Sequence, residues 1–149
     1  MNNYVDYYNY MNNLNTNLNV NQISMPSAKM KFDYTTDPVT AFMRGNLFSN
    51  LYTPYKNYRP VELNPSNEKE YALLMVQMYA FVAHELTLYL DTNPTDSNAI
   101  KLRSNYINMH MQALAQYESK YGPLGVDSKM LEATPWAWTT KTWPWEGNK

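Results

Sequence analysis

The adjacent His84 and Glu85 are the residues of this sequence that most invite a metal or acid–base interpretation. A zinc protease helix carries a second histidine four residues after the first, but Leu88 stands at that position. A dimetal carboxylate bundle needs Glu-x-x-His on two helices, whereas Leu88 follows Glu85 at that spacing and Tyr121 follows Glu118. Both motifs fail, so the sequence predicts no catalytic residues, no metal ligands and no cofactor.

A contact between Glu85 and His110 is the second arrangement of interest. Glu85 lies at the edge of the apolar stripe of one predicted helix, and His110 lies between Ile107 and Leu114 on the inner side of the next. We interpret the two as a buried polar pair that satisfies itself. The alternative is a small metal-dependent oxidoreductase that uses Glu85, His110 and nearby carboxylates.

The composition of the chain excludes several classes of partner and of binding site. The net charge is −1, with 12 basic and 13 acidic side chains, so nucleic acid and anionic membranes are not expected as partners. The absence of cysteine removes disulfides and thiolate zinc sites. The N-terminus has no signal-peptide pattern, and the longest apolar run, "YALLMVQMYAFVA" at 71–83, reads as too short to span a bilayer. We expect a soluble protein.

The elements that would position these side chains are two long helices. Asn64 and the proline after it open the first, which we expect over about 65–90, where "DTNP" ends it. The second should run over about 94–121, because Gly122 and the following proline stop it. The sequence therefore predicts an all-α fold built on a long antiparallel two-helix hairpin.

The first helix is apolar in almost every direction, so one partner helix cannot cover it. We expect the hairpin to be wrapped by extended N-terminal and tryptophan-rich C-terminal arms, or to be covered by another subunit in an oligomer. The C-terminal arm carries all four tryptophans, at Trp136, Trp138, Trp143 and Trp145. They could pack on the hairpin, dock on another protein, or stack on a sugar.

Two regions precede the hairpin. Residues 1–30 form an asparagine-rich arm that is either a disordered tail or, through the alternation at 13–23, a strand that orders against a partner chain. Residues 31–63 contain a predicted short helix at 38–44 and then a tyrosine and proline ribbon. The candidate assembly strand carries Leu14, Leu18 and Val20, and the ribbon, as a candidate interaction surface, carries Tyr52, Tyr55 and Tyr58.

Three stretches carry a family resemblance: "HELTLYLDTNPTDSNAI", "YESKYGPLG" and "PWAWTTKTWPWE". Together they resemble the CotJB family of spore coat proteins over about residues 68–146, which makes 64–149 a CotJB-like domain. Upstream, "GNLFSNLYTPYKNY" is similar to the core of the companion CotJA family, with Asn46 where that family usually has threonine. Residues 31–63 thus read as a CotJA-like segment fused to the domain, with the tyrosine and proline ribbon as the cover that the hairpin needs.

The resemblance implies a non-enzymatic structural or adaptor protein of the bacterial endospore coat. It implies synthesis in the mother cell cytoplasm, followed by assembly with itself, with other coat proteins and with a manganese-catalase-like partner of the CotJC type. Two rival functions stay open. One is the metal-dependent oxidoreductase described above, and the other is a glycan-binding module that uses the tryptophan tail.

Overall fold

The computed structural model describes residues 35–59 and 63–139, all of which belong to one compact unit, Lys31–Lys149. These ranges form an all-α fold, as predicted, with a single isolated bridge between Thr35 and Phe48 and no strand. The predicted assembly strand with Leu14, Leu18 and Val20 lies outside the described residues. Trp143 and Trp145 also lie outside them.

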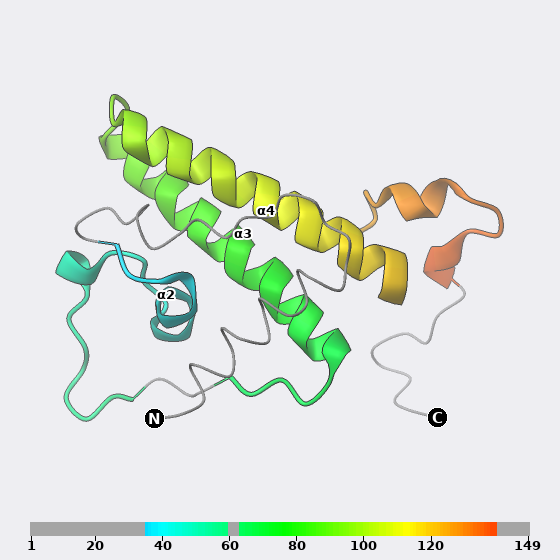
Figure 1. The fold of residues 1–149 in the computed structure, drawn as a ribbon, viewed down its shortest axis with the longest axis horizontal. Helices are drawn as coiled ribbons and strands as arrows, with labels where there is room; N and C mark the ends of the chain where they lie inside the picture. The colour runs from blue at the N-terminus through cyan, green and yellow to red at the C-terminus, as the bar shows by residue number, and fades with distance from the viewer. Residues whose placement is uncertain (1–34, 60–62, 140–149) are drawn as a thin grey trace, which may run out of the picture. The chain divides into compact units, whose positions relative to one another are not determined.

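The hairpin consists of α3 (Glu68–Thr92) and α4 (Ser97–Tyr121), each 25 residues long (Figure 1). Both helices begin about three residues later than the sequence pattern suggests. Asp96 caps α4 by accepting from the backbone N–H groups of Asn98 and Ala99 at 3.0 and 3.1 Å. Helix α4 ends at Tyr121, as expected, and is followed by Gly122 with a φ of 95°, whereas α3 extends two residues beyond its expected end, to Thr92. The predicted antiparallel hairpin is confirmed.

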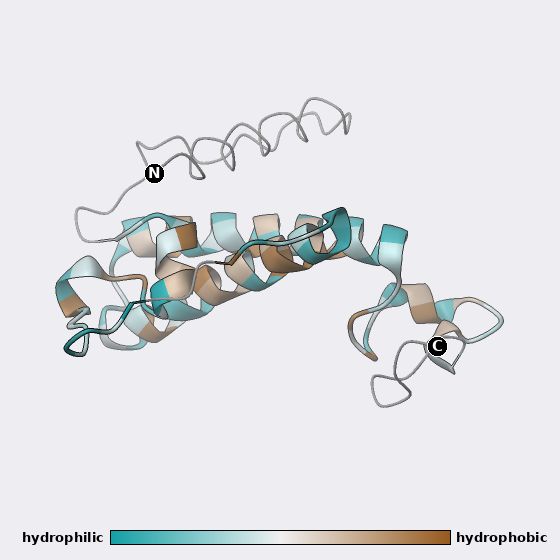
Figure 2. Ribbon diagram, turned by 90° about the horizontal axis from the view of Figure 1, so that it is seen from below, coloured by the Kyte–Doolittle hydropathy of each residue, from teal (hydrophilic) through white to brown (hydrophobic). Residues whose placement is uncertain are grey.

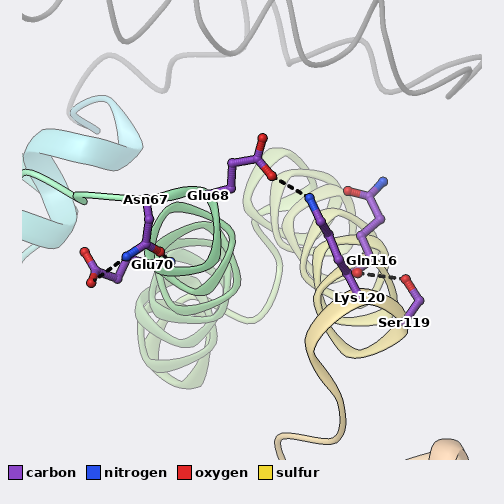
Figure 3. A network of polar contacts seen from close by, with 6 residues as sticks. All are labelled: Asn67, Glu68, Glu70, Gln116, Ser119 and Lys120. Atoms are coloured by element: carbon purple, nitrogen blue, oxygen red, sulfur yellow. Dashed lines mark hydrogen bonds and ion pairs between the residues drawn. The ribbon is translucent and has the colours of Figure 1, made fainter.

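The start of α3 is a reciprocal cap between Asn67 and Glu70 (Figure 3). The Asn67 side chain accepts from the Glu70 N–H at 2.9 Å, while the Glu70 carboxylate accepts from Asn67 Nδ2 at 3.0 Å and the Ser66 N–H at 2.7 Å. Such a capping box satisfies donors that the first helical turn leaves free. Asn67 caps the helix in preference to Asn64, which has no glutamate three residues later. This explains why α3 begins later than predicted.

Changing Asn67 to alanine should therefore lower the free energy of unfolding by about 1 kcal/mol, the usual effect of losing an N-cap. The matched control is Asn64→Ala, because Asn64 is an exposed asparagine outside the helix. Urea denaturation followed by circular dichroism measures both. Equal losses in the two variants would contradict the assignment of the cap.

Three side-chain bonds connect α3 and α4 and show the antiparallel register of the hairpin. Lys120 pairs with Glu68 at one end (Figure 3), His110 Nδ1 bonds the Val76 carbonyl at 3.1 Å in the middle, and Arg103 Nε donates to Thr87 Oγ1 at 2.7 Å nearer the turn. Hydrophobic residues recur along the two helices of the hairpin (Figure 2). The most buried hairpin side chains include Met75, Val76, Met78, Val82, Leu86, Ala99, Leu102, Tyr106 and Met109.

The pair at the open end of the hairpin is exposed and should matter only over a defined pH range. Its hydrogen bond lowers the pKa of Glu68 from the ordinary 4.5 and raises the pKa of Lys120 from the ordinary 10.5. The Glu68 contribution is therefore present above pH 4.5 and is lost as pH falls further, while the Lys120 contribution is present below pH 10.5 and is lost as pH rises further.

We expect Lys120→Met to reduce stability slightly at neutral pH, because exposed pairs contribute little and are screened by salt. Unfolding curves of the variant and the parent protein should converge in acid, once Glu68 is protonated. They should also converge at neutral pH in concentrated salt. A difference that persists in acid would show that the lysine stem, and not its charge, is responsible.

Helix α3 is longer than its apolar run. By length and composition, Glu68–Thr92 could cross a membrane. The length argument against a bilayer span therefore does not hold, because the helix continues beyond residue 83. The same composition is typical of a helix packed against several neighbours, and α3 packs against both α4 and the short helix α2 (Pro38–Arg44).

Candidate interaction surface

The loop after α2 packs on α3 through two apolar side chains. Asp37 caps α2 by accepting from the Thr40 N–H at 3.0 Å, and Gly45 ends it with a φ of 72°. The chain then turns back, so that Leu47 is 1% exposed and Phe48 is 6% exposed. Phe42 of α2 meets Phe81 of α3 edge to face, with ring centroids 5.6 Å apart. We call residues 35–52 the docked segment.

A charged side chain on each side holds the peptide group between Asn46 and Leu47. The Arg44 guanidinium Nε donates to the Asn46 carbonyl at 2.8 Å, and the Leu47 N–H donates to Glu85 Oε2 of α3 at 3.1 Å. The neighbouring backbone groups are also bonded: the Thr36 N–H donates to the Leu47 carbonyl at 2.9 Å. An apolar loop can be buried at this position because its polar backbone groups have partners.

The predicted pair of Glu85 and His110 does not form, because each side chain has another partner. Glu85 accepts from Leu47, while His110 bonds the Val76 carbonyl through Nδ1, which must then carry the proton. The antiparallel register explains the error. His110 lies beside Val76, and Glu85 is nine positions further along α3, about 14 Å away along the helix axis.

Tyr89 connects the docked segment to the hairpin turn. Its ring stacks on Phe48 with centroids 5.0 Å apart and an interplanar angle of 26°, and its hydroxyl donates to Asp96 Oδ2 at 3.1 Å. Asp96 in turn caps α4 through its other carboxylate oxygen. One side chain thus contacts the docked segment, the end of α3 and the start of α4, which gives this tyrosine of the "LYLDTNP" stretch a physical role.

The tyrosine and proline ribbon does not cover the hairpin as predicted. Tyr52 is half-buried, with the Arg44 guanidinium 4.8 Å from its ring centroid. Tyr55 is 86% exposed and Tyr58 is 50% exposed, in a turn where Asn57 has a φ of 66°. Among the described residues, the cover of this side of α3 comes from the docked segment instead, because Leu47 and the phenylalanines supply the apolar contacts.

Glu118 anchors the exit from the hairpin, a contact that the sequence reading missed. The carboxylate is buried, at 9% exposure, and accepts from the Leu124 N–H at 2.9 Å and from Ser128 Oγ at 2.7 Å. These bonds fold residues 122–128 back onto the last turn of α4. A signal was available, because an acidic residue placed four positions after Leu114 on an apolar stripe, just before Gly122, indicates a buried partner.

Beyond Glu118 the described chain contains two short 3-10 helices, η3 (Lys129–Glu132) and η4 (Ala137–Thr139). Trp136 is half exposed and Trp138 is half-buried. The exit segment, residues 122–139, thus presents a run of solvent-exposed apolar side chains: Leu124, Val126, Met130 and Trp136. A second exposed group begins at Leu51, near the end of the docked segment, and continues with Tyr55, Tyr58 and Leu63.

The titratable side chains of the described ranges do not gather into a metal-binding group. No set of three or more His, Asp or Glu residues within 35–59 and 63–139 has the proximity to hold an ion. Burial raises the pKa of the Tyr117 hydroxyl, and the neighbouring Tyr121, whose ring centroid is 5.1 Å away, adds to the effect. The described residues therefore present apolar and aromatic side chains at the surface, and the carboxylates of Glu85 and Glu118 bind backbone N–H groups.

Comparison with known proteins gives a family match. A family model described as CotJB protein matches residues 70–146, which is more than half of the chain. The match begins at Glu70 of the capping box and includes the hairpin, Tyr89, Glu118 and the exit segment. The docked segment lies outside it, and the comparisons do not support the CotJA likeness. No curated protein and no solved structure matches the chain.

Proposed function

Because the chain belongs to the CotJB family of spore coat proteins, we propose that it is a non-enzymatic structural and adaptor protein of the endospore coat. It assembles with copies of itself and with a manganese-catalase-like coat protein, after synthesis in the mother cell. Residues 31–63 contribute the part that a CotJA-like partner would otherwise supply, tied to the hairpin in one chain. Such a tether raises the local concentration of one part near the other.

The observation that carries the proposal is that the carboxylates and the exposed apolar side chains have different structural roles. The carboxylates of Glu85 and Glu118 are bonded to backbone groups of neighbouring segments, which is a structural use. Exposed apolar side chains lie on the exit segment and in the ribbon, and three more lie on the hairpin, at Leu88, Ile100 and Met111. Aromatic side chains of this kind are enriched where proteins bind each other.

The charge of the chain favours recognition by apolar contact over electrostatic steering. With a net charge of −1, the protein presents no large field to a partner. We therefore expect its complex with the catalase-like protein to survive 1 M salt, where the Debye length is about 3 Å. Release of the partner by salt alone would contradict this part of the proposal.

Co-purification from sporulating cells tests the proposal. The tagged full-length chain should bring down the catalase-like protein, and deletion of 134–149 should weaken that association if the tryptophan tail forms the interface. Deletion of 1–30 should instead reduce higher assembly if that arm links copies. Purified protein that contains a stoichiometric transition metal, lost on changing His110 to alanine, would support the oxidoreductase alternative and overturn the proposal.

A further inference from the structure

We propose that the docked segment exchanges between copies, so that Leu47 and Phe48 of one chain occupy the site on α3 of a second copy. The inference deepens the self-assembly part of the proposed function and rests on it. It concerns how copies are joined, and it requires no surface beyond the one that already exists within a single chain. Each exchanged copy would contribute Phe42, Leu47 and Phe48 to the contacts with its neighbour's α3.

The docked segment is suited to exchange because its internal bonds are separate from its bonds to α3. Asp37 and Gly45 cap α2 from within the segment, and the Thr36 N–H closes the loop on the Leu47 carbonyl at 2.9 Å. The contacts with α3 include the Glu85 carboxylate on the Leu47 N–H, Phe81 against Phe42 and Tyr89 against Phe48. The segment can therefore keep its fold on another copy's α3.

The connection between the docked segment and α3 makes few bonds of its own. Residues 53–59 are exposed throughout, and a backbone hydrogen bond within them joins the Tyr58 N–H to the Tyr55 carbonyl at 3.0 Å. Closer to α3, the Ser66 N–H bonds Glu70 as part of the helix cap. Within these described parts, opening the connection would cost one turn hydrogen bond. A low-cost hinge of this kind is a requirement for exchange.

The length of the connection permits both arrangements. From Tyr89, where Phe48 docks, back to Glu68 at the start of α3 is 21 positions, or about 32 Å along the helix. The 16 residues from Tyr52 to Asn67 can span about 53 Å when extended. Reaching a second α3 placed about 20 Å to the side, roughly two helix diameters, requires about 38 Å. The same chain can thus close on itself or on a neighbour.

The contacts are the same in both forms, so concentration decides between them. A short flexible tether gives an effective concentration of about a millimolar order within one chain. Dilute protein should stay closed, whereas a packed protein layer at comparable concentration should favour exchange. Exchange would then link copies when the chain is concentrated on a surface and not before.

Disulfide trapping tests the exchange. Because the chain has no cysteine of its own, only the introduced cysteines can form a disulfide. The variants Phe48→Cys and Tyr89→Cys are prepared separately, mixed at millimolar concentration and oxidised. Exchange predicts a mixed disulfide between positions 48 and 89, identified by mass spectrometry of proteolytic peptides. The double variant at micromolar concentration should form the same bond within one chain, which checks that the geometry allows it. Phe42→Cys with Phe81→Cys provides an independent second pair.

The matched control is Lys56→Cys mixed with Tyr89→Cys, because position 56 is exposed and has no docking site. The proposal would be overturned if the double variant closes normally but the yield of the intermolecular 48–89 disulfide is no greater than the yield of the 56–89 control. Light scattering of the unmodified protein distinguishes failure of the exchange proposal from failure of the proposed self-assembly. Association without mixed disulfide defeats exchange and leaves self-assembly standing, whereas a strict monomer at millimolar concentration defeats both.

Discussion

Replacing Leu47 with alanine should lower the free energy of unfolding by about 2–5 kcal/mol, the range for large-to-small changes in a packed core. Leu47 is 1% exposed, and its removal would leave a cavity between the docked segment and α3. The same change should weaken the bond between the Leu47 N–H and Glu85, because the loop loses its apolar anchor. Urea denaturation followed by circular dichroism measures the loss.

Leu51 provides the matched control, four residues later in the same segment. It is 65% exposed, so Leu51→Ala should change stability by no more than about 0.5 kcal/mol, as is usual for surface positions. If the two leucine variants have the same stability, the docked segment does not pack on α3 in solution. The comparison tests the placement of the segment independently of any function.

Changing Glu118 to alanine should cost about 1–3 kcal/mol, because it leaves the Leu124 N–H and the Ser128 hydroxyl without their acceptor. It should also free residues 122–128 from the end of α4. We expect trypsin to cleave after Lys129 faster in this variant, in addition to a lower urea midpoint.

Glu132→Ala is the control for Glu118→Ala, since Glu132 is an exposed acidic residue of the same exit segment. It should leave both the urea midpoint and the cleavage rate near those of the parent protein. Faster cleavage in both variants would show that loss of charge is enough to free the segment. In that case the buried hydrogen bonds of Glu118 would not be the cause.

The hairpin could be predicted from sequence because its signals are local. Caps, a helical apolar pattern and the Gly122 stop all lie within a few residues of the boundaries they set. The sequence pattern predicts too early a start for α3 because it contains two asparagines that could each cap the helix. Asn67 prevails through Glu70, three residues further on, which also bonds the Ser66 N–H.

The docking of Leu47 on Glu85 could not be predicted in this way. The two residues are 38 positions apart, and no periodic pattern connects a loop N–H with a distant carboxylate. The Glu85 and His110 hypothesis failed for a related reason. Facing directions on two helices say nothing about their axial register, which depends on the length of the turn and on pairs such as Thr87 with Arg103.

The central claim is that this chain acts through exposed aromatic surface as a building component of the spore coat. The most direct measurement is the amount of chain in coat extracts of purified spores, for the parent protein and for a Tyr55→Ser, Tyr58→Ser variant. Both side chains are exposed, so the variant should fold normally and yet be depleted from the coat. Absence of the parent protein from the coat extract, or full incorporation of the variant, would contradict the claim.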